Sequence, residues 1–433
     1  MARIVLNTFG SLGDLHPFLA IAIELKTRGH DPVVAAAEIY REKVKAEGVQ
    51  FAPVRPDLGA LAADSKLMER IWDPRRGPEF LLREVLIPTA EESFEDVARA
   101  AAGADLLVTH TAAYGGHIAA EALRLRWVSA VLQPMTLFSA YDPPVFPSAP
   151  WLKYFYALGQ GAFRLTRRLA RWQTDRWMEP LGALRRRLGL PQAANPVFEG
   201  QFSPSGTLAL FSKHFAQPQP DWPARTTMTG FVFYDRLGMN AADNNSEELE
   251  AFLTAGPPPV VFTLGSSAVM QAEQFFYESA LAAQQMRRRA VLLTGKQEDQ
   301  HLPPALPDSI FIAEYAPYSQ LLPRSVATVH QGGIGTTAQA LRAGRPMLVV
   351  PWSHDQPDNA ERVCNLGLAR TLPRHRYTAA RVTKELERLL SNPSYAQKAG
   401  EIRAALLSEN GTGTAADALE AILLENRVTA VFR

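Results

Sequence analysis

The sequence has very little cysteine, almost no net charge and no long hydrophobic run. Cys364 is the only cysteine in 433 residues, which excludes an internal disulfide and a metal cluster built from cysteines. A formal charge of +1 gives no reason to expect nucleic acid as a partner. No apolar run approaches the length of a membrane span, and Met1 is followed almost at once by a strand rather than a signal peptide. We therefore expect a cytoplasmic protein.

The most informative stretch combines an apolar strand, a glycine-rich turn and a helix start. Residues 325–329 predict a short buried strand, and residues 336–343 predict a helix that ends at Gly344. The turn between them offers free backbone N–H groups and the positive end of the helix dipole, which together favour an anion. Its residues are His330, Gln331, Gly332, Gly333, Gly335, Thr336 and Thr337.

A second loop follows the next predicted strand, residues 347–350. It contains Trp352, Asp355 and Gln356. In an open parallel sheet the carboxyl ends of the strands lie at one edge, so both loops are expected at the same ligand site. One loop suits a phosphate, while a carboxylate and an amide beside it suit sugar hydroxyls. The pair predicts a site for a nucleotide-sugar.

These motifs, at this spacing, resemble the donor-binding signature of the GT-B glycosyltransferases of the UDP-glucuronosyltransferase and plant glucosyltransferase superfamily. The turn is followed by Gly344-Arg345-Pro346 and then by the sequence Asp-Gln-x-x-Asn-Ala at residues 355–360. The resemblance implies an α/β fold of the GT-B type, with two Rossmann-like domains whose parallel sheets face each other across a cleft. The expected ranges are an acceptor domain at 1–235, a linker at 236–259, a donor domain at 260–410 and a C-terminal helix at 411–433 that packs back across the domains.

The same resemblance implies further donor contacts. It places a second phosphate loop at Gly265, Ser266 and Ser267, and an aromatic residue that stacks on the base at Tyr315, followed by Ala316. The diphosphate-contacting His of the family falls at Gln331, one residue after His330, and its ribose-binding Glu falls at Gln339. An amide serves the two ribose hydroxyls only in part, which favours a dTDP-sugar, whose deoxyribose needs no such clamp.

The first predicted strand, residues 4–8, runs into Gly10-Ser11-x-Gly13-Asp14. This resembles the amino-terminal signature of the bacterial, sterol and glycopeptide branches, and implies that Asp14 is the general base for the acceptor hydroxyl. The alternative is that Asp14 is a helix N-cap, a common role for Asp at this place. His16 is a second candidate for the base.

His110 follows another predicted strand and occupies the place of an Asp that orients the base in plant members. Two interpretations stay open: it hydrogen-bonds Asp14 or the acceptor, or it is a polar loop residue. The residues that we expect to contact the acceptor are Leu12, His16, Tyr114, Phe138 and Trp352.

Residues 151–190 predict a basic helical region with nine Lys or Arg against Asp175 and Glu179. Tryptophans accompany these charges, so a weak peripheral contact with an anionic membrane is one interpretation. The other is a helical insertion that lines the acceptor pocket and turns an arginine face to solvent. Gly159 and Pro180 favour the second, because they interrupt a continuous face.

Several segments are also similar to the rhamnosyltransferases of rhamnolipid synthesis, including residues 137–140, 221–223 and 354–362. This implies a dTDP-L-rhamnose donor and a hydrophobic or amphiphilic acceptor, such as a hydroxy-fatty acid or a flavonoid. The alternative is a UDP-glucose-dependent glucosyltransferase of a sterol, polyketide or phenolic. A nucleotide-sugar epimerase and a non-catalytic binding homologue are further alternatives. Direct displacement with Asp14 as the base implies an inverting enzyme. No Asp-x-Asp motif stands near the donor signature, so we expect no metal or other cofactor.

Overall fold

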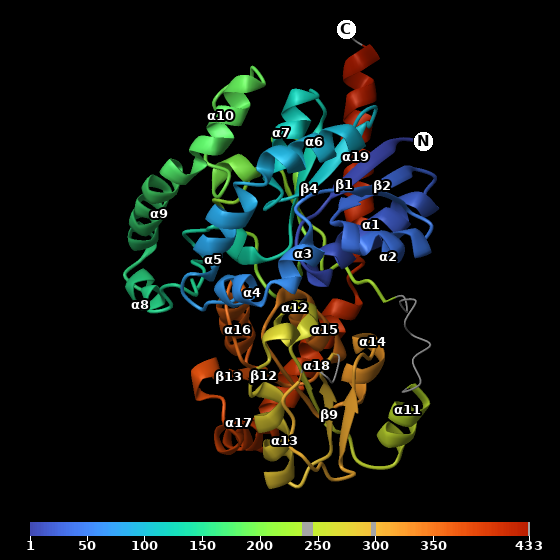
Figure 1. Ribbon diagram of the computed structural model, residues 1–433, viewed down its shortest axis with the longest axis vertical. Helices are drawn as coiled ribbons and strands as arrows, with labels where there is room; N and C mark the ends of the chain where they lie inside the picture. Colours follow the sequence, from blue (N-terminus) through green and yellow to red (C-terminus); the bar gives the residue numbers. More distant parts are fainter. Residues whose placement is uncertain (236–245, 296–299, 432–433) are drawn as a thin grey trace. The chain divides into compact units, whose positions relative to one another are not determined.

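The computed structural model describes residues 1–235, 246–295 and 300–431; the side chains of 246, 267 and 426–431 are outside the description. The chain divides into two compact units, which are treated separately. The N-terminal unit contains residues 1–71, 75–234 and 409–433, and the C-terminal unit contains 72–74 and 235–408. Figure 1 shows both units, with the N-terminal unit in blue and green.

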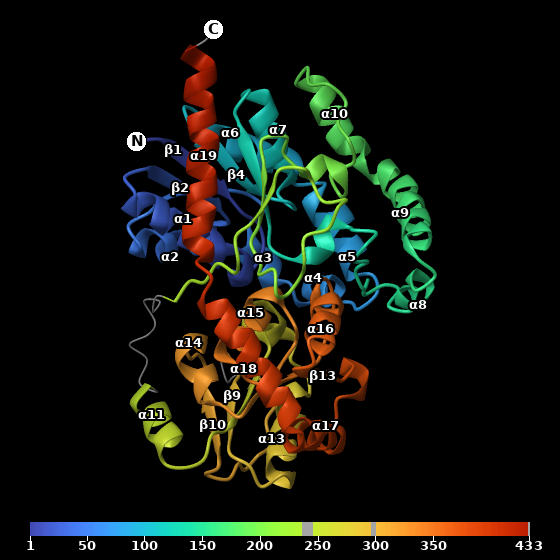
Figure 2. The same ribbon diagram turned by 180° about the vertical axis from the view of Figure 1, so that it is seen from behind.

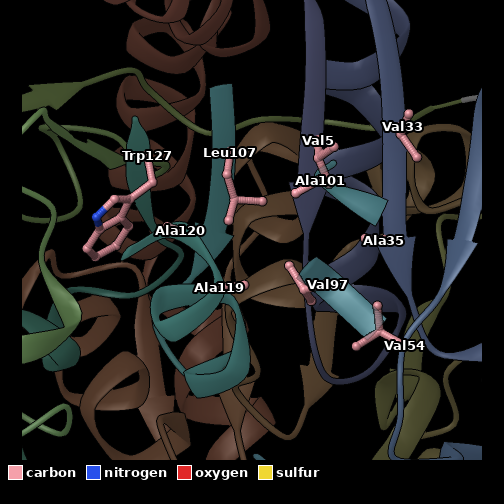
Figure 3. Close-up of a cluster of buried hydrophobic side chains, with 10 residues drawn as sticks. All are labelled: Val5, Val33, Ala35, Val54, Val97, Ala101, Leu107, Ala119, Ala120 and Trp127. Carbon is pink, nitrogen blue, oxygen red and sulfur yellow. The ribbon is translucent and has the colours of Figure 1, made fainter. Parts of the chain in front are cut away.

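The N-terminal unit is built on a seven-stranded parallel sheet of order β3-β2-β1-β4-β5-β6-β7. The strands are β1 (Arg3–Asn7), β2 (Asp31–Ala36), β3 (Gln50–Pro53), β4 (Leu106–His110), β5 (Trp127–Val131), β6 (Thr207–Ala209) and β7 (Thr226–Met228). Figure 3 shows Val5, Val33 and Leu107 on adjacent strands, beside Val97 and Ala119 on the helices that cover this face. Burial of these apolar side chains holds the helices on the sheet.

The helices of this unit connect the strands in sequence and pack against the sheet. They are α1 (Leu12–Thr27), α2 (Arg41–Ala46), α3 (Leu58–Ala63), α4 (Ser65–Ile71), α5 (Gly77–Phe80), α6 (Ala90–Ala100), α7 (Tyr114–Ala122), α8 (Leu152–Tyr156), α9 (Gln160–Asp175), α10 (Glu179–Arg187) and α19 (Gly411–Val431). The predicted helical region at 151–190 is thus three α-helices, with Gly159 at φ 108° between α8 and α9. Among the described residues, no helix is long and apolar enough to cross a membrane.

The C-terminal helix α19 belongs to the N-terminal unit and lies beside α1 (Figure 2). Arg28, at the end of α1, forms ion pairs with Asp417 and Glu420, and His30 contacts Glu420 at 3.0 Å. The helix begins at Gly411, where a Cβ would lie 2.2 Å from a carbonyl oxygen of Phe231. Only glycine allows this approach of the two backbones.

The C-terminal unit is built on a six-stranded parallel sheet of order β10-β9-β8-β11-β12-β13. The strands are β8 (Val260–Thr263), β9 (Ala290–Leu293), β10 (Ile310–Ala313), β11 (Ala327–His330), β12 (Met347–Val349) and β13 (Ala369–Thr371). The helices are α11 (Ser246–Thr254), α12 (Gly265–Ala268), α13 (Phe275–Gln285), α14 (Tyr318–Leu321), α15 (Ile334–Ala343), α16 (Gln356–Asn365), α17 (Ala379–Ser391) and α18 (Pro393–Leu407). The predicted α/β class with two parallel sheets is confirmed.

The stretch expected as a linker, 236–259, is not all linker. Residues 236–245 lie outside the described part, but α11 follows directly and occupies Ser246–Thr254. Its partly exposed residues carry little apolar periodicity, and the prolines after it suggest a loop. The segment that leads into β8 therefore contains a helix that was not predicted from the sequence.

Candidate functional site

Asp14 lies at the third position of α1, directly beyond the carboxyl end of β1. The N-cap of the helix is Ser11, whose hydroxyl accepts from the N–H of Gly13 at 3.2 Å. Asp14 Oδ2 accepts in return from the Ser11 N–H at 2.7 Å, which completes a capping box. The alternative that Asp14 is itself the N-cap is wrong. Gly10, at φ 125°, is needed because a Cβ there would lie 2.3 Å from Asp14 Oδ2.

The Asp14 carboxyl group is buried enough to change its acidity and open enough to meet a ligand. Burial raises the pKa of Asp14 from 3.8 to about 6, and the hydrogen bonds from Ser11 offset part of this effect. The side chain remains 26% exposed. A carboxylate with these properties is suited to accept a proton near neutral pH.

His110, the last residue of β4, faces the free oxygen of this carboxylate. Its Nε2 lies 4.0 Å from Asp14 Oδ1, which is too long for a direct hydrogen bond. Its Nδ1 accepts from the N–H of Ala112 at 3.2 Å, and burial lowers the pKa of the imidazole to about 4. The neutral ring therefore carries its proton on Nε2, on the side of Asp14. Nε2 is buried and has no partner among the described residues.

His16, the second candidate for the base, is placed differently. Its ring stacks on Tyr234 with 4.8 Å between the ring centroids. Burial, with a smaller contribution from the charge of Lys43, lowers the pKa of His16 to about 3. A group this weakly basic is a poor proton acceptor, so the structure argues against His16 as the base.

A small pocket opens in the N-terminal unit beside the loops that follow β1 and β4, and neither Asp14 nor His110 is among the residues that line it. Tyr114, the first residue of α7, forms part of its wall together with Phe9, Ala113 and Leu86. The lining is mainly apolar, with the residues Asn7, Thr8, Phe9, Ala37, Val54, Arg55, Pro56, Leu86, Thr89, Ala90, Ser93, Ala112, Ala113, Tyr114 and Gly115.

The other residues expected at the acceptor are dispersed. Leu12 is the first residue of α1 and is partly buried, two positions before Asp14. Phe138 belongs to an aromatic cluster, with its ring centroid 4.9 Å from that of Phe198. Trp352 lies in the C-terminal unit, is 3% exposed, and has the Arg374 guanidinium 3.7 Å above its ring. The prediction that Trp352 is an acceptor contact is not supported, because its ring is buried beneath Arg374.

The donor-signature loops of the C-terminal unit come together at one edge of its sheet. Strands β8, β11 and β12 are neighbours and parallel, so the segments after their carboxyl ends converge. Gly265, at φ 67°, allows the first two loops to touch, since a Cβ there would lie 2.5 Å from Gln331 Nε2. Ser266 is exposed at the start of α12, and the side chain of Ser267 lies outside the described residues.

His330 does not face this edge. It is completely buried; its Nδ1 accepts from the Gly332 N–H at 3.0 Å, and its Nε2 lies 3.3 Å from the Met347 sulfur. Burial lowers the pKa of His330 to about 3, so the ring is neutral. The sequence left open whether His330 or the backbone amides serve the diphosphate, and the inward direction of this ring favours the amides. Gln331 holds the neighbouring position, 5% exposed, with Oε1 unpartnered among the described residues.

The two threonines at the start of α15 are also turned inward. Thr337 is completely buried and its hydroxyl has no partner among the described residues. Thr336 is 6% exposed and hydrogen-bonds Tyr318, whose hydroxyl lies 2.7 Å from that of Thr263. The N–H groups of Gly332 and Ile334 donate to His330 and Asp355, so the groups left for an anion are mainly the N–H groups of Gly333 and Gly335, with the helix dipole behind them.

Asp355 and Gln356 are held firmly at the adjacent loop. Asp355 Oδ2 accepts from the Ile334 N–H at 3.3 Å and from Asn359 Nδ2 at 2.6 Å. Gln356 Oε1 accepts from the Trp352 N–H at 2.8 Å, and its Nε2 has no acceptor among the described residues. Asn359 also donates to the Gly332 carbonyl at 2.9 Å, which ties the two loops together. Asn359 was noted within the motif but given no role; its position four residues after Asp355 was the available signal.

A third group of donor-signature residues lies near the amino terminus of α14 and on α15. Tyr315 is 56% exposed, whereas Ala316 is 2% exposed. Gln339 Oε1 accepts from Arg342 at 2.8 Å, and Arg342 forms a two-pronged ion pair with Asp235. Arg342 was not among the predicted site residues. Because this arginine occupies the carbonyl of Gln339, the amide N–H₂ is the part left for a ligand.

Known proteins match this chain along most of its length. Residues 4–138 match the glycosyltransferase family 28 N-terminal domain, and residues 283–422 match the erythromycin biosynthesis protein CIII-like C-terminal domain. The chain is 32% identical over 456 residues to the O-mycaminosyltylonolide 6-deoxyallosyltransferase of Streptomyces fradiae, across 99% of both chains. It is 26% identical over 430 residues to the sterol 3-beta-glucosyltransferase UGT80B1 of Arabidopsis thaliana, across 96% of this chain and 67% of that one.

Among solved structures, the glycosyltransferase VinC in complex with dTDP has a TM-score of 0.68 at 22% identity. The alignment covers 98% of this chain and 100% of that chain. At this level of identity the likeness shows the fold alone, and it extends over both units.

Proposed function

The chain belongs to the erythromycin CIII-like GT-B glycosyltransferases, and we propose that it transfers a 6-deoxyhexose from a dTDP-sugar to the hydroxyl group of a hydrophobic acceptor. The observation that carries the proposal is the buried Asp14 carboxylate, with a pKa of about 6, facing the Nε2–H of His110. This pair provides one proton acceptor and one fixed donor at the mouth of the first βα loop. That arrangement suits activation of a hydroxyl nucleophile.

In the proposed reaction the acceptor hydroxyl lies between the two side chains. Its oxygen accepts from His110 Nε2–H, and its proton passes to Asp14 Oδ1 as the oxygen attacks the anomeric carbon. The new C–O bond forms while the bond to the diphosphate breaks, so the configuration at the anomeric carbon inverts. Asp14 Oδ2 stays in the capping box, which fixes the orientation of the carboxylate.

The leaving diphosphate is assigned to the amide-rich edge of the C-terminal unit. The N–H groups of Gly333 and Gly335, exposed Ser266 and the Gln331 amide are the proposed donors, with Asp355 and Gln356 on the sugar hydroxyls. Charge that develops on the leaving oxygen is stabilised by fixed N–H groups and a helix dipole, without a metal ion. Activity should therefore be the same in EDTA as without it. Loss of activity that magnesium restores would contradict this part of the proposal.

The sugar nucleotide is inferred from the ribose end of the site. Gln339, which the resemblance places at the ribose, has an amide where the family has a carboxylate. Its carbonyl oxygen accepts a hydrogen bond from Arg342. Such a site has little with which to favour a ribose over a deoxyribose. One relative transfers 6-deoxyallose by its name, and a structural neighbour holds dTDP. We favour dTDP-L-rhamnose, on the sequence resemblance described above.

The class of acceptor is inferred from the sequence resemblance, which implies a hydrophobic or amphiphilic molecule with a reactive hydroxyl; Tyr114 lines a small, mainly apolar pocket beside the loops after β1 and β4. A second candidate function is the transfer of glucose from UDP-glucose to a sterol, which is favoured by the likeness to a sterol 3-beta-glucosyltransferase. Both functions use the same base and differ in donor and acceptor.

Incubation with nucleotide-sugars and a panel of acceptors tests the proposal. The donors are dTDP-L-rhamnose and UDP-glucose; the acceptors are a hydroxy-fatty acid, a flavonoid and a sterol, and the products are measured by mass. A deoxyhexose adduct that depends on the dTDP-sugar is the expected result. A hexose adduct from UDP-glucose alone would favour the second candidate, and the absence of any adduct with all donors would contradict both.

A further inference from the structure

Helices α8 and α9 carry many of the exposed apolar side chains of the described structure. Fourteen large hydrophobic residues are exposed in the described part of the chain, and six of them lie between positions 151 and 172, on α8, on α9 or directly beside α8. These six are Trp151 at 64%, Tyr154 at 73%, Leu158 at 77%, Leu165 at 52%, Leu169 at 57% and Trp172 at 63%. Figures 1 and 2 show both helices along the outer edge of the N-terminal unit. Such a concentration marks an interaction surface rather than scattered exposure.

Helix α9 is apolar on two opposite faces. Its inner face holds it to the unit through Phe163, which is 1% exposed and lies 5.1 Å from the ring of Tyr156. The spacing of Leu165, Leu169 and Trp172 places their side chains together on the outer face. We call these three residues the outer face of α9. Phe163 on the inner face holds α9 to the unit, whereas these three side chains are exposed and are available to a partner.

The charge around the outer face is mainly basic, although Arg167 and Arg171 of α9 form ion pairs with Glu199. Between positions 151 and 178 there are six basic residues and one acidic residue, Asp175, which accepts from Asn195 at 2.8 Å. Among the described residues, Arg164 and Arg168 have no ion pair. Arg176 lies over the Trp172 ring at 4.8 Å. The partner that complements this surface is both apolar and anionic.

We propose that the outer face of α9 binds an anionic phospholipid surface. Leu165, Leu169 and Trp172 enter the boundary between head groups and acyl chains, and the neighbouring arginines meet the lipid phosphates. Tryptophan, with an apolar ring and one N–H, is a side chain typical of this boundary. A second copy of the chain complements the surface poorly, because a two-fold contact brings arginines against arginines. The proposal is independent of the proposed donor and acceptor.

Sedimentation of the full chain with vesicles tests this. The vesicles contain phosphatidylcholine alone, or equimolar phosphatidylglycerol and phosphatidylcholine. We expect binding to the anionic vesicles that weakens with salt, and weak binding to the neutral ones. The triple variant Leu165→Gln/Leu169→Gln/Trp172→Gln should bind at least about ten-fold less. In Arg164→Gln/Arg168→Gln, each lost arginine should lower the partition coefficient about five-fold.

The matched control is Leu407→Gln/Leu424→Gln, which changes two leucines of similar exposure, 59% and 60%, on other helices. It should bind vesicles as the unchanged protein does. Equal binding by the triple variant, or no binding by the unchanged protein, would overturn the proposal. A dimer in sedimentation velocity that the triple variant dissociates would assign the face to a second copy instead. A rise of the acceptor KM in the triple variant, measured without vesicles, would assign it to the acceptor pocket.

Discussion

Asp14 Oδ1 and His110 Nε2 lie 4.0 Å apart at the carboxyl ends of the neighbouring strands β1 and β4. This separation is too long for a direct hydrogen bond, and an oxygen atom placed about 2.8 Å from both atoms would bridge them. The other carboxylate oxygen of Asp14 is engaged by Ser11, so only Oδ1 is free to react. The proposed mechanism places the acceptor hydroxyl at this bridging position, and the predictions below follow from that placement.

The pH dependence of turnover should report the Asp14 carboxyl group. The base acts only when it is ionised, and burial raises its pKa to about 6. We therefore expect kcat/KM for the acceptor to rise about ten-fold per pH unit below pH 6 and to level off above it. The measurement is a pH profile at saturating nucleotide-sugar. A fall of kcat/KM centred near pH 4 would mean that the carboxylate is fully solvated, and it would contradict the assignment of a buried Asp14 as the base.

His110 is expected to position the acceptor hydroxyl and not to titrate. Its pKa of about 4 keeps the ring neutral throughout the working range. His110→Ala should lower kcat/KM for the acceptor about ten- to hundred-fold, whereas His110→Gln, which keeps an N–H donor, should retain more activity. The acidic limb near pH 6 should persist in both variants. Loss of that limb in either variant would make His110 the base instead.

The choice of nucleotide should depend on the residue at position 339. With Gln339 held by Arg342, we expect dTDP to bind at least as tightly as UDP in calorimetric titrations. Gln339→Glu introduces a carboxylate for the ribose hydroxyls and should shift the preference toward UDP. UDP binding about ten-fold tighter than dTDP to the unchanged protein, a difference of about 1.4 kcal/mol, would contradict the donor assignment.

The sequence predicted the central strands better than the edges of the sheets. The four strands predicted above correspond to β1, β4, β11 and β12, which are interior strands of their sheets. The strands β3, β7 and β13, each at the edge of its sheet, were not predicted, and most of their residues are only partly buried or exposed. A strand buried on both faces is a continuous apolar run, which is visible in the sequence. An edge strand is specified by its pairing with a neighbour, and that pairing is not visible in a local pattern.

At the candidate site, the motifs located the loops but not the direction of each side chain. The spacing of the glycines and of Asp355 predicted that the loops after β8, β11 and β12 lie at one edge of the sheet, because the carboxyl ends of parallel strands meet there. His330 ends its strand with a ring directed into the core, a direction that the motif position alone left open. The capping box of Ser11 and Asp14 was readable as a Ser-x-x-Asp pattern. The 4.0 Å approach of His110 Nε2 to Asp14 Oδ1 was not readable from the sequence, since it depends on the register of β1 and β4.

The central claim is that Asp14 removes the proton from the acceptor, and single-turnover measurements on Asp14→Asn test it most directly. The control is Asp57→Asn, the same change at another helix start, where Asp57 caps α3. Since burial raises the pKa of Asp14 from 3.8 to about 6, ionisation costs the folded state up to about 3 kcal/mol above pH 6. Asp14→Asn should therefore unfold at pH 8 at no lower temperature than the unchanged protein.

With folding and nucleotide binding intact, the rate of sugar transfer in Asp14→Asn should fall by about two to four orders of magnitude. Asp57→Asn should transfer sugar at the normal rate. A near-normal rate in a folded, nucleotide-binding Asp14→Asn variant would contradict the account.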